Sequence, residues 1–259
     1  MPALFAILLV LLGYSLAEGD VARSAHFMFA PDFSKVTPVA VLSALGHAFF
    51  SLSLGMGAVM VYGSYLQRHV SIARTSLFVA LADTAVGLLV GLAIFALVFA
   101  NGLEPAAGPG LIFQTLPIAF GKMPGGSFIG TLFFLLVAFA AWTSAISLVE
   151  PAIAWLTENT RLTRLQAAWL IGLTDWVLGI AVLLSFSAWK DVRLLFGLNI
   201  FDTLDKLTTN ILLPLGGLLM ALFAGWVMKT HHVQEELNVS TRPYQLWRFT
   251  IRFVSPLAI

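Results

Sequence analysis

The sequence lacks cysteine and is poor in charged residues. Without Cys, a disulfide framework, a thiolate metal site and a cysteine nucleophile are excluded. Asp, Glu, Lys and Arg together make up 10% of the 259 residues, whereas soluble domains average about 25% charged residues. So few charged residues cannot provide the polar surface that a protein in water needs. The composition therefore excludes a soluble enzyme and a disordered segment.

An excess of charge of either sign is also missing. Lys and Arg number 14 and Asp and Glu 13, so the formal net charge is +1. No concentrated basic face results, and we expect no nucleic-acid partner. What the sequence does have is apolar surface, since 59% of its residues are hydrophobic. The composition therefore predicts an all-α polytopic membrane protein that contacts the lipid bilayer.

The apolar stretches predict the number of membrane spans. A bilayer core of about 30 Å needs roughly 20 apolar residues in one helix. We predict a single transmembrane domain over residues 1–259, with spans at about 3–17, 36–67, 75–103, 123–156, 165–189 and 207–228, and a truncated one from 247.

Basic residues in the loops predict the orientation of these spans. If the spans alternate, one side of the membrane holds Arg68, Arg74, Arg161, Arg164, Lys229, Arg242, Arg248 and Arg252. That side is predicted to be cytoplasmic. Asp202 and Asp205 then lie at the external mouth of the sixth span.

The stretch 36–67 is too long for one plain span and is weak at its centre. There the sequence reads Ser51-Leu52-Ser53-Leu54-Gly55-Met56-Gly57, and Gly and Ser both weaken helices. In lipid, an unwound stretch survives only where it is buried in protein or lines a cavity. A discontinuous helix is typical of transporter binding sites; a small-residue packing face is the alternative.

Asp83, Asp175 and His47 are ionisable residues within the predicted spans. Asp83 is a candidate site residue, because a carboxylate at membrane depth costs about 2.5–3.5 kcal/mol on insertion scales. A protonated, hydrogen-bonded Asp is the alternative. Asp175 has no neighbouring motif and is interpreted as structural. His47 precedes Ser51 by one helical turn and fits either packing or proton coupling.

The fourth span offers oxygen ligands without charge. The Ala140 carbonyl and the hydroxyls of Thr143 and Ser144 suit a small hard cation. Alternatively, the hydroxyls bond carbonyls one turn back.

The histidines outside the spans are not expected to bind metal. Zinc and copper sites are not predicted, because we place His26, His69, His231 and His232 in loops without ligand spacing. The loop at 108–126 alternates helix breakers with apolar residues and should pack back into an outer vestibule rather than project into water.

These motifs, in their order along the chain, resemble the bacterial amino-acid branch of the neurotransmitter:sodium symporter family. The resemblance links 46–57 to its unwound sixth helix, 108–126 to its extracellular hairpin, 140–151 to its eighth helix and 202–217 to its tenth. It covers the family's fifth helix to the start of its eleventh. The resemblance implies the second inverted repeat of a LeuT-like fold, with a discontinuous helix at 36–67.

The resemblance also implies roles for individual residues. It assigns to the substrate pocket Phe50, Ser51, Ser53, Met56, Ser144 and Leu148. It assigns to a first sodium ion Ser51 and Asp83, and to a second the Ala140 carbonyl, Thr143 and Ser144. The outer gate would include Asp205, and the inner gate Tyr65 and Glu158.

Two departures from the family bear on its anion dependence. His47 stands where the family usually has glutamine, and Gly87 stands where chloride-independent members can carry an acid. We expect Asp83 to supply the compensating charge, so that transport does not require chloride.

The resemblance implies sodium-coupled symport of an apolar amino acid by alternating access. The expected location is the plasma membrane, most simply the inner membrane of a bacterium. We expect no enzyme, since nothing brings Asp83 and Asp175 together as a carboxylate pair.

The alternative is a non-transporting structural or partner subunit, or an inactive fragment of a transporter. The family's first four helices have no counterpart here, so a closed site would need a missing N-terminal half, and a homodimer is the other partner considered. The isolated chain is not expected to bind substrate in a saturable, sodium-dependent way.

Overall fold

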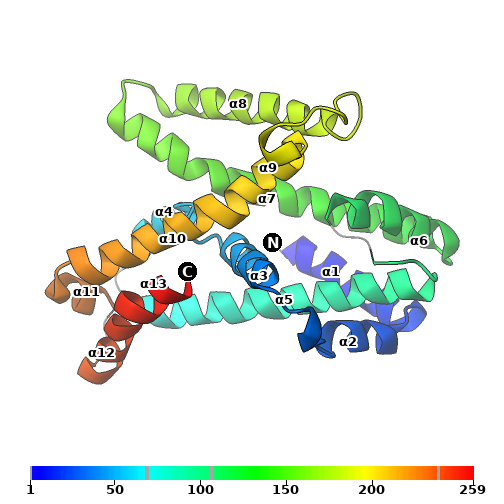
Figure 1. Ribbon diagram of the computed structural model, residues 1–259, viewed down its shortest axis with the longest axis horizontal. Coiled ribbons are helices and arrows are strands. Elements are labelled where there is room, and N and C mark those ends of the chain that lie inside the picture. Colours follow the sequence, from blue (N-terminus) through cyan, green and yellow to red (C-terminus); the bar gives the residue numbers. More distant parts are fainter. Residues whose placement is uncertain (1, 68–69, 106–107, 238–239) are drawn as a thin grey trace. The chain divides into compact units, whose positions relative to one another are not determined.

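The computed structural model describes residues 2–67, 70–105, 108–237 and 240–259. Over these residues the chain is helical and contains no β-strand (Figure 1). The predicted all-α fold class is confirmed.

The α-helices follow one another along the chain as α1 (Pro2–Glu18), α2 (Val21–Phe29), α3 (Pro38–Ser51), α4 (Ala58–Ser64), α5 (Ile72–Ala100), α6 (Leu116–Lys122), α7 (Gly126–Asn159), α8 (Arg164–Leu184), α9 (Ile200–Leu207), α10 (Leu213–Leu222), α11 (Thr230–Leu237), α12 (Thr241–Phe249) and α13 (Ser255–Ala258). Short 3-10 turns are η1 (Phe33–Lys35) and η3 (Leu195–Gly197), and π-helical turns are η2 (Leu111–Thr115), η4 (Thr208–Leu212), η5 (Phe223–Val227) and η6 (Thr250–Val254).

Several helices are long and apolar enough to cross a membrane. Among the described residues four pass by length and composition: Ile72–Ala100, Gly126–Asn159, Arg164–Leu184 and Ile200–Val227. A fifth span results if α1 and α2, which meet at a bend of 107°, are counted together. The helix α3 is shorter but also apolar.

The chain divides into two compact units. Unit 1 comprises Met1–Val36 and Val79–Ala145, and unit 2 comprises Thr37–Phe78 and Ile146–Ile259. The helices α5 and α7 each have one end in unit 1 and the other in unit 2.

The core of unit 1 is built from apolar side chains of four helices. Its buried members are Leu11 of α1, Leu97 and Val98 of α5, Leu116 and Phe120 of α6, and Ile129 and Phe133 of α7. The helix α6 lies in the segment 108–126 and contributes Leu116 and Phe120 to this core. Between membrane helices such contacts stabilise by close van der Waals packing, because lipid tails are as apolar as the side chains.

Candidate functional site

The candidate site is organised around the gap between α3 and α4 in unit 2. The helix α3 begins at a Thr37 cap, whose hydroxyl accepts from the Ala40 amide at 3.1 Å, and ends at Ser51. The helix α4 begins at Ala58. The predicted discontinuity within 36–67 is therefore confirmed, and it comprises residues 52–57.

The gap is made by backbone in the left-handed region. Gly55 has a φ of 81° and Gly57 a φ of 84°, which glycine adopts without steric cost. Ser53 has a φ of 54°, where a side chain costs of order 1–3 kcal/mol. The Leu54 amide still donates to the Phe49 carbonyl at 2.8 Å, which closes the end of α3. The Gly-rich sequence thus stops one helix and starts another.

The gap lies against the helix formed by η4 and α10, and α3 also contacts this helix (Figure 1). A Cβ atom at Gly55 would collide with the Leu213 carbonyl, and one at Gly216 would collide with the Gly55 carbonyl. At Gly55 the unwound backbone therefore lies against protein, which is the condition for non-helical structure at membrane depth.

Glycine also brings α3 close to the same helix. At Gly46 a Cβ would meet the Thr209 carbonyl, and at Gly217 it would meet the buried ring of Phe49. The Thr209 hydroxyl donates to the Asp205 carbonyl at 2.7 Å. Asp205, the candidate outer-gate residue, is thus one turn from the contact with α3, and its own side chain is exposed.

A cavity of about 330 Å³ adjoins the gap in unit 2. Its walls come from the gap itself, from α10 and from the segment of η6 and α13. Of the residues predicted to bind substrate, Ser53 lines this cavity. Phe50 and Leu148 have exposed side chains, and Met56 is half-buried.

The predicted ligands of the second sodium ion lie on α7 within unit 1. The Thr143 hydroxyl donates to the carbonyls of Ala140 at 3.0 Å and Phe139 at 3.1 Å. Ser144 is the next residue and is exposed. The structure therefore brings the Thr143 and Ala140 oxygens together. It also shows the back-bonding expected of a helical hydroxyl.

The predicted ligands of the first sodium ion belong to different units. Ser51 is the last residue of α3 in unit 2, and Asp83 is a half-buried residue of α5 in unit 1. His47 is exposed on α3, and Asp175 is exposed on α8.

A polar cluster joins α4 to α7 and α8. The Tyr65 hydroxyl donates to Glu150 Oε1 in a long hydrogen bond of 3.4 Å. Glu150 also accepts from Arg164 Nη2, at 2.8 Å to Oε1 and 2.7 Å to Oε2. The Glu150 side chain is 14% exposed and that of Arg164 65%. One turn earlier, the Tyr62 hydroxyl donates to Ser147 Oγ at 2.6 Å.

The partner of Tyr65 was not identified from the sequence. Glu158, the predicted companion of Tyr65 in the inner gate, is exposed near the end of α7. The carboxylate that Tyr65 contacts is Glu150, which lies eight positions earlier. A signal was present, because Glu150 is an ionisable residue inside the predicted span 123–156, and such residues are site candidates by default.

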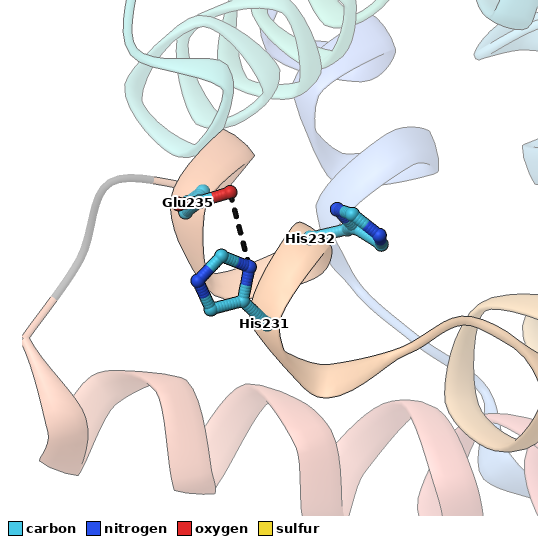
Figure 2. Close-up of side chains that lie close together, drawn as sticks. All are labelled: His231, His232 and Glu235. Carbon is cyan, nitrogen blue, oxygen red and sulfur yellow. Dashed lines mark ion pairs between the residues drawn. The ribbon is translucent and has the colours of Figure 1, made fainter.

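The prediction that the histidines lie in loops is wrong where the structure describes them. His26 lies in α2, and His231 and His232 lie in α11. His69 falls outside the described residues. Figure 2 shows the two histidines of α11 with Glu235, and ligand atoms of all three lie within 4.8 Å of one another. The short helix was missed because a single pair of apolar residues, Val233 and Leu237, marks it in a polar segment.

Comparison with known proteins shows that the chain is similar to sodium-dependent transporters. The model of the family described as "Sodium:neurotransmitter symporter family" matches residues 1–259. An "uncharacterized sodium-dependent transporter YhdH" of Bacillus subtilis (strain 168) is 38% identical over 267 residues, covering 100% of this chain and 58% of the relative. A further uncharacterized sodium-dependent transporter, from Haemophilus influenzae, is 35% identical and is covered over 57% of its length.

A solved structure shares the fold. The crystal structure of MhsT in complex with L-phenylalanine matches with a TM-score of 0.92 and 40% sequence identity. The match covers 100% of this chain and 59% of that one. The LeuT-like fold class is thereby confirmed. The chain spans between half and two thirds of the length of these relatives.

Proposed function

Because the chain belongs to the sodium:neurotransmitter symporter family, we propose that it forms part of a sodium-coupled symporter that moves an apolar amino acid by alternating access. The observation that carries this proposal is the gap at residues 52–57, whose backbone packs on α10. The names of the relatives, sodium-dependent transporters, support the ion. The complex of MhsT with L-phenylalanine supports the substrate class. The proposed location is the inner membrane of a bacterium.

The end of α3 is the proposed centre of the substrate site. A helix C-terminus carries partial negative charge from its unpaired carbonyls, which favours cations. Residues at this end, Phe50 and Ser51, would therefore face the substrate ammonium group and a sodium ion. Ser53 and Met56 of the gap, with Ser144 and Leu148 of α7, would surround the rest of the amino acid. Met56 and Leu148 favour an apolar side chain.

Two sodium sites are proposed. Ser51 and Asp83 would hold the first ion, and the Ala140 carbonyl with the Thr143 and Ser144 hydroxyls the second. The 3.0 Å between Thr143 Oγ1 and the Ala140 oxygen supports the second site. Two oxygens at this separation can both reach a cation whose oxygen ligands lie at about 2.4 Å, as in calcium sites. A hydroxyl oxygen that donates its hydrogen keeps lone pairs, which can face an ion.

Asp83 is proposed to make chloride unnecessary. A carboxylate beside the first sodium ion supplies a negative charge that chloride would otherwise supply. Uptake should therefore continue when chloride is replaced by gluconate. Loss of uptake on this replacement would contradict the proposed role of Asp83.

Gating is proposed to involve Asp205 outside and Tyr65 and Glu158 inside. The contact of Tyr65 with the Glu150–Arg164 pair supports an inner gate at the end of α4. For α4 to move against α7, the Tyr65–Glu150 and Tyr62–Ser147 bonds must break. Sodium and substrate would couple by both favouring one occluded state, which is a linkage between their binding equilibria.

The proposal is tested by uptake into proteoliposomes that contain the complete protein. An inward sodium gradient should drive accumulation of radiolabelled phenylalanine or leucine, and replacing sodium by choline should abolish it. Absence of uptake with any apolar amino acid would favour a non-transporting structural or partner subunit.

A single substitution tests the second sodium site in the same assay. Thr143→Val keeps the shape of the side chain and removes the hydroxyl, so the sodium concentration for half-maximal uptake should rise about tenfold or more, equivalent to about 1.4 kcal/mol. Thr131→Val is the matched control, because the Thr131 hydroxyl makes the same kind of bond, to the Ser127 carbonyl at 2.8 Å, on the same helix. Equal sodium dependence of the two variants would exclude Thr143 as a ligand.

A further inference from the structure

The segment that follows α10 carries a cluster of metal-ligating side chains on α11. His231, His232 and Glu235 each offer one ligand atom, and these atoms lie within 4.8 Å of one another. His231 Nδ1 and Glu235 Oε2 are 3.3 Å apart and form an ion pair when the imidazole is protonated, as Figure 2 shows. Their side chains are 77% and 62% exposed. The proposed symport does not use these residues.

The packing of α11 turns the cluster outward. Val233 is buried and Leu237 half-buried, and residues four apart share one helix face. His231 and Glu235 are also four apart, and His232 and Glu235 three apart, so these three share another face. The first residue of the helix, Thr230, accepts a hydrogen bond from Arg248 of α12. The helix is therefore fixed by one face while the other presents the two imidazoles and the carboxylate.

We propose that His231, His232 and Glu235 bind a divalent transition-metal ion, with zinc as the best-fitting example. Imidazole nitrogen and carboxylate oxygen are ordinary zinc ligands at about 2.0–2.2 Å, which places two ligands of a tetrahedral ion about 3.3–3.5 Å apart. The 3.3 Å between His231 Nδ1 and Glu235 Oε2 fits this separation. His232 completes the set by a side-chain rotation, which its exposure permits.

The donor set selects against the hard cations. Two imidazoles and one carboxylate suit zinc, nickel or copper, whereas calcium and magnesium require mostly oxygen ligands. Three protein ligands leave a position for water on the ion. Binding would link two successive turns of a helix that has only eight residues. A helix of this length is marginal by itself, so the ion would stabilise α11.

The test is isothermal titration calorimetry, in which zinc chloride is added to the purified, tag-free full chain in detergent. One saturable ion per chain is expected, removable by a chelator. His231→Ala should weaken binding at least tenfold. His26→Ala is the matched control, because His26 lies on α2 in the other unit and should leave the affinity unchanged. No saturable binding, or equal affinity in His231→Ala and the unsubstituted chain, would overturn the proposal.

A second pair of variants separates coordination from general surface charge. Glu235→Gln keeps the size of a coordinating side chain and should weaken zinc binding severalfold. Glu236→Gln removes the same charge from the neighbouring exposed residue of α11, outside the cluster, and should change the affinity little. Equal losses in both variants would show that zinc is held by nonspecific attraction, which contradicts a defined site. The readout needs neither substrate nor a sodium gradient, so it is independent of the proposed symport.

Discussion

The cluster around Leu116 in unit 1 and the gap beside α10 in unit 2 hold helices together in opposite ways. In unit 1, Leu116, Val98 and Phe120 fill the space between four helices with side chains. In unit 2, Gly55 and Gly216 remove side chains, so that backbone meets backbone. The first contact is sensitive to removed methyl groups and the second to added ones. The first contact holds four helices by their side chains, whereas the second holds a non-helical stretch against a helix by its backbone.

The largest expected effect comes from adding one methyl group at the gap. Gly55→Ala would place a Cβ against the Leu213 carbonyl at a φ of 81°. Backbone strain and the collision together should cost more than about 3 kcal/mol. Thermal unfolding followed by tryptophan fluorescence should show a large fall in Tm. Gly63→Ala is the control, because nothing lies within 4 Å of its Cβ position on α4; equal falls in both variants would contradict the comparison.

Removing methyl groups should damage unit 1. Leu116 has no exposed surface, and Leu→Ala at such a site costs about 2–5 kcal/mol through lost contacts and a cavity. The same unfolding measurement should show a clear fall in Tm for Leu116→Ala. Ile118→Ala on the same helix is the control, since Ile118 is exposed and makes fewer contacts. A fall as large for Ile118→Ala would mean that burial of the side chain does not determine how much a residue of α6 contributes to stability, because Ala is the better helix former of the two.

An intermediate effect is expected at the polar cluster of unit 2. Glu150→Gln weakens the bonds to Tyr65 and Arg164. The end of α4 should then separate from α7 more often. Because the sequence has no Cys, a Ser64→Cys variant gives a single labelling site on this helix. Its maleimide labelling should become severalfold faster with Glu150→Gln.

Glu158→Gln is the matched comparison for this labelling experiment, since it changes an exposed carboxylate on the same helix as Glu150. A rate increase equal to that of Glu150→Gln would show that the Tyr65–Glu150 contact does not hold α4.

The smallest effect should come from relieving strain in the gap. Ser53 has a φ of 54°, and Ser53→Gly should stabilise by about 0.5–1 kcal/mol, because glycine adopts this conformation freely. The corresponding rise in Tm is about 2 °C. Phe196→Gly tests the same relief in an exposed turn, since Phe196 has a φ of 55°. A fall in Tm for Ser53→Gly alone would mean that the Ser53 side chain stabilises the gap.

The sequence predicted features that depend on local composition. The apolar stretches predicted an all-helical membrane protein, and the Ser and Gly residues at 51–57 predicted the discontinuous helix. These predictions succeeded because helix weakness and apolar length are properties of neighbouring residues. The order of the motifs then identified the family.

Features that depend on distant pairs were not predicted. Gly216 and Gly217 are visible in the sequence, but their partners Gly55 and Phe49 lie more than 150 positions away. The pairing of Glu150 with Arg164 requires the turn between α7 and α8 to bring the two side chains together. The α11 cluster was missed because an eight-residue helix shows too little periodicity to be recognised.

The two tyrosines of the polar cluster fix how α4 is aligned along α7. Tyr62 pairs with Ser147, and Tyr65 pairs with Glu150. The two tyrosines are three residues apart, and so are their two acceptors. The two segments therefore run parallel at this point, with donors and acceptors repeating at the same interval. A slide by three residues, roughly one turn, would break both bonds and bring one tyrosine opposite the acceptor of the other. In the shifted alignment one hydroxyl would again have an acceptor and the other would have lost its own, so the slide costs one of the two hydrogen bonds.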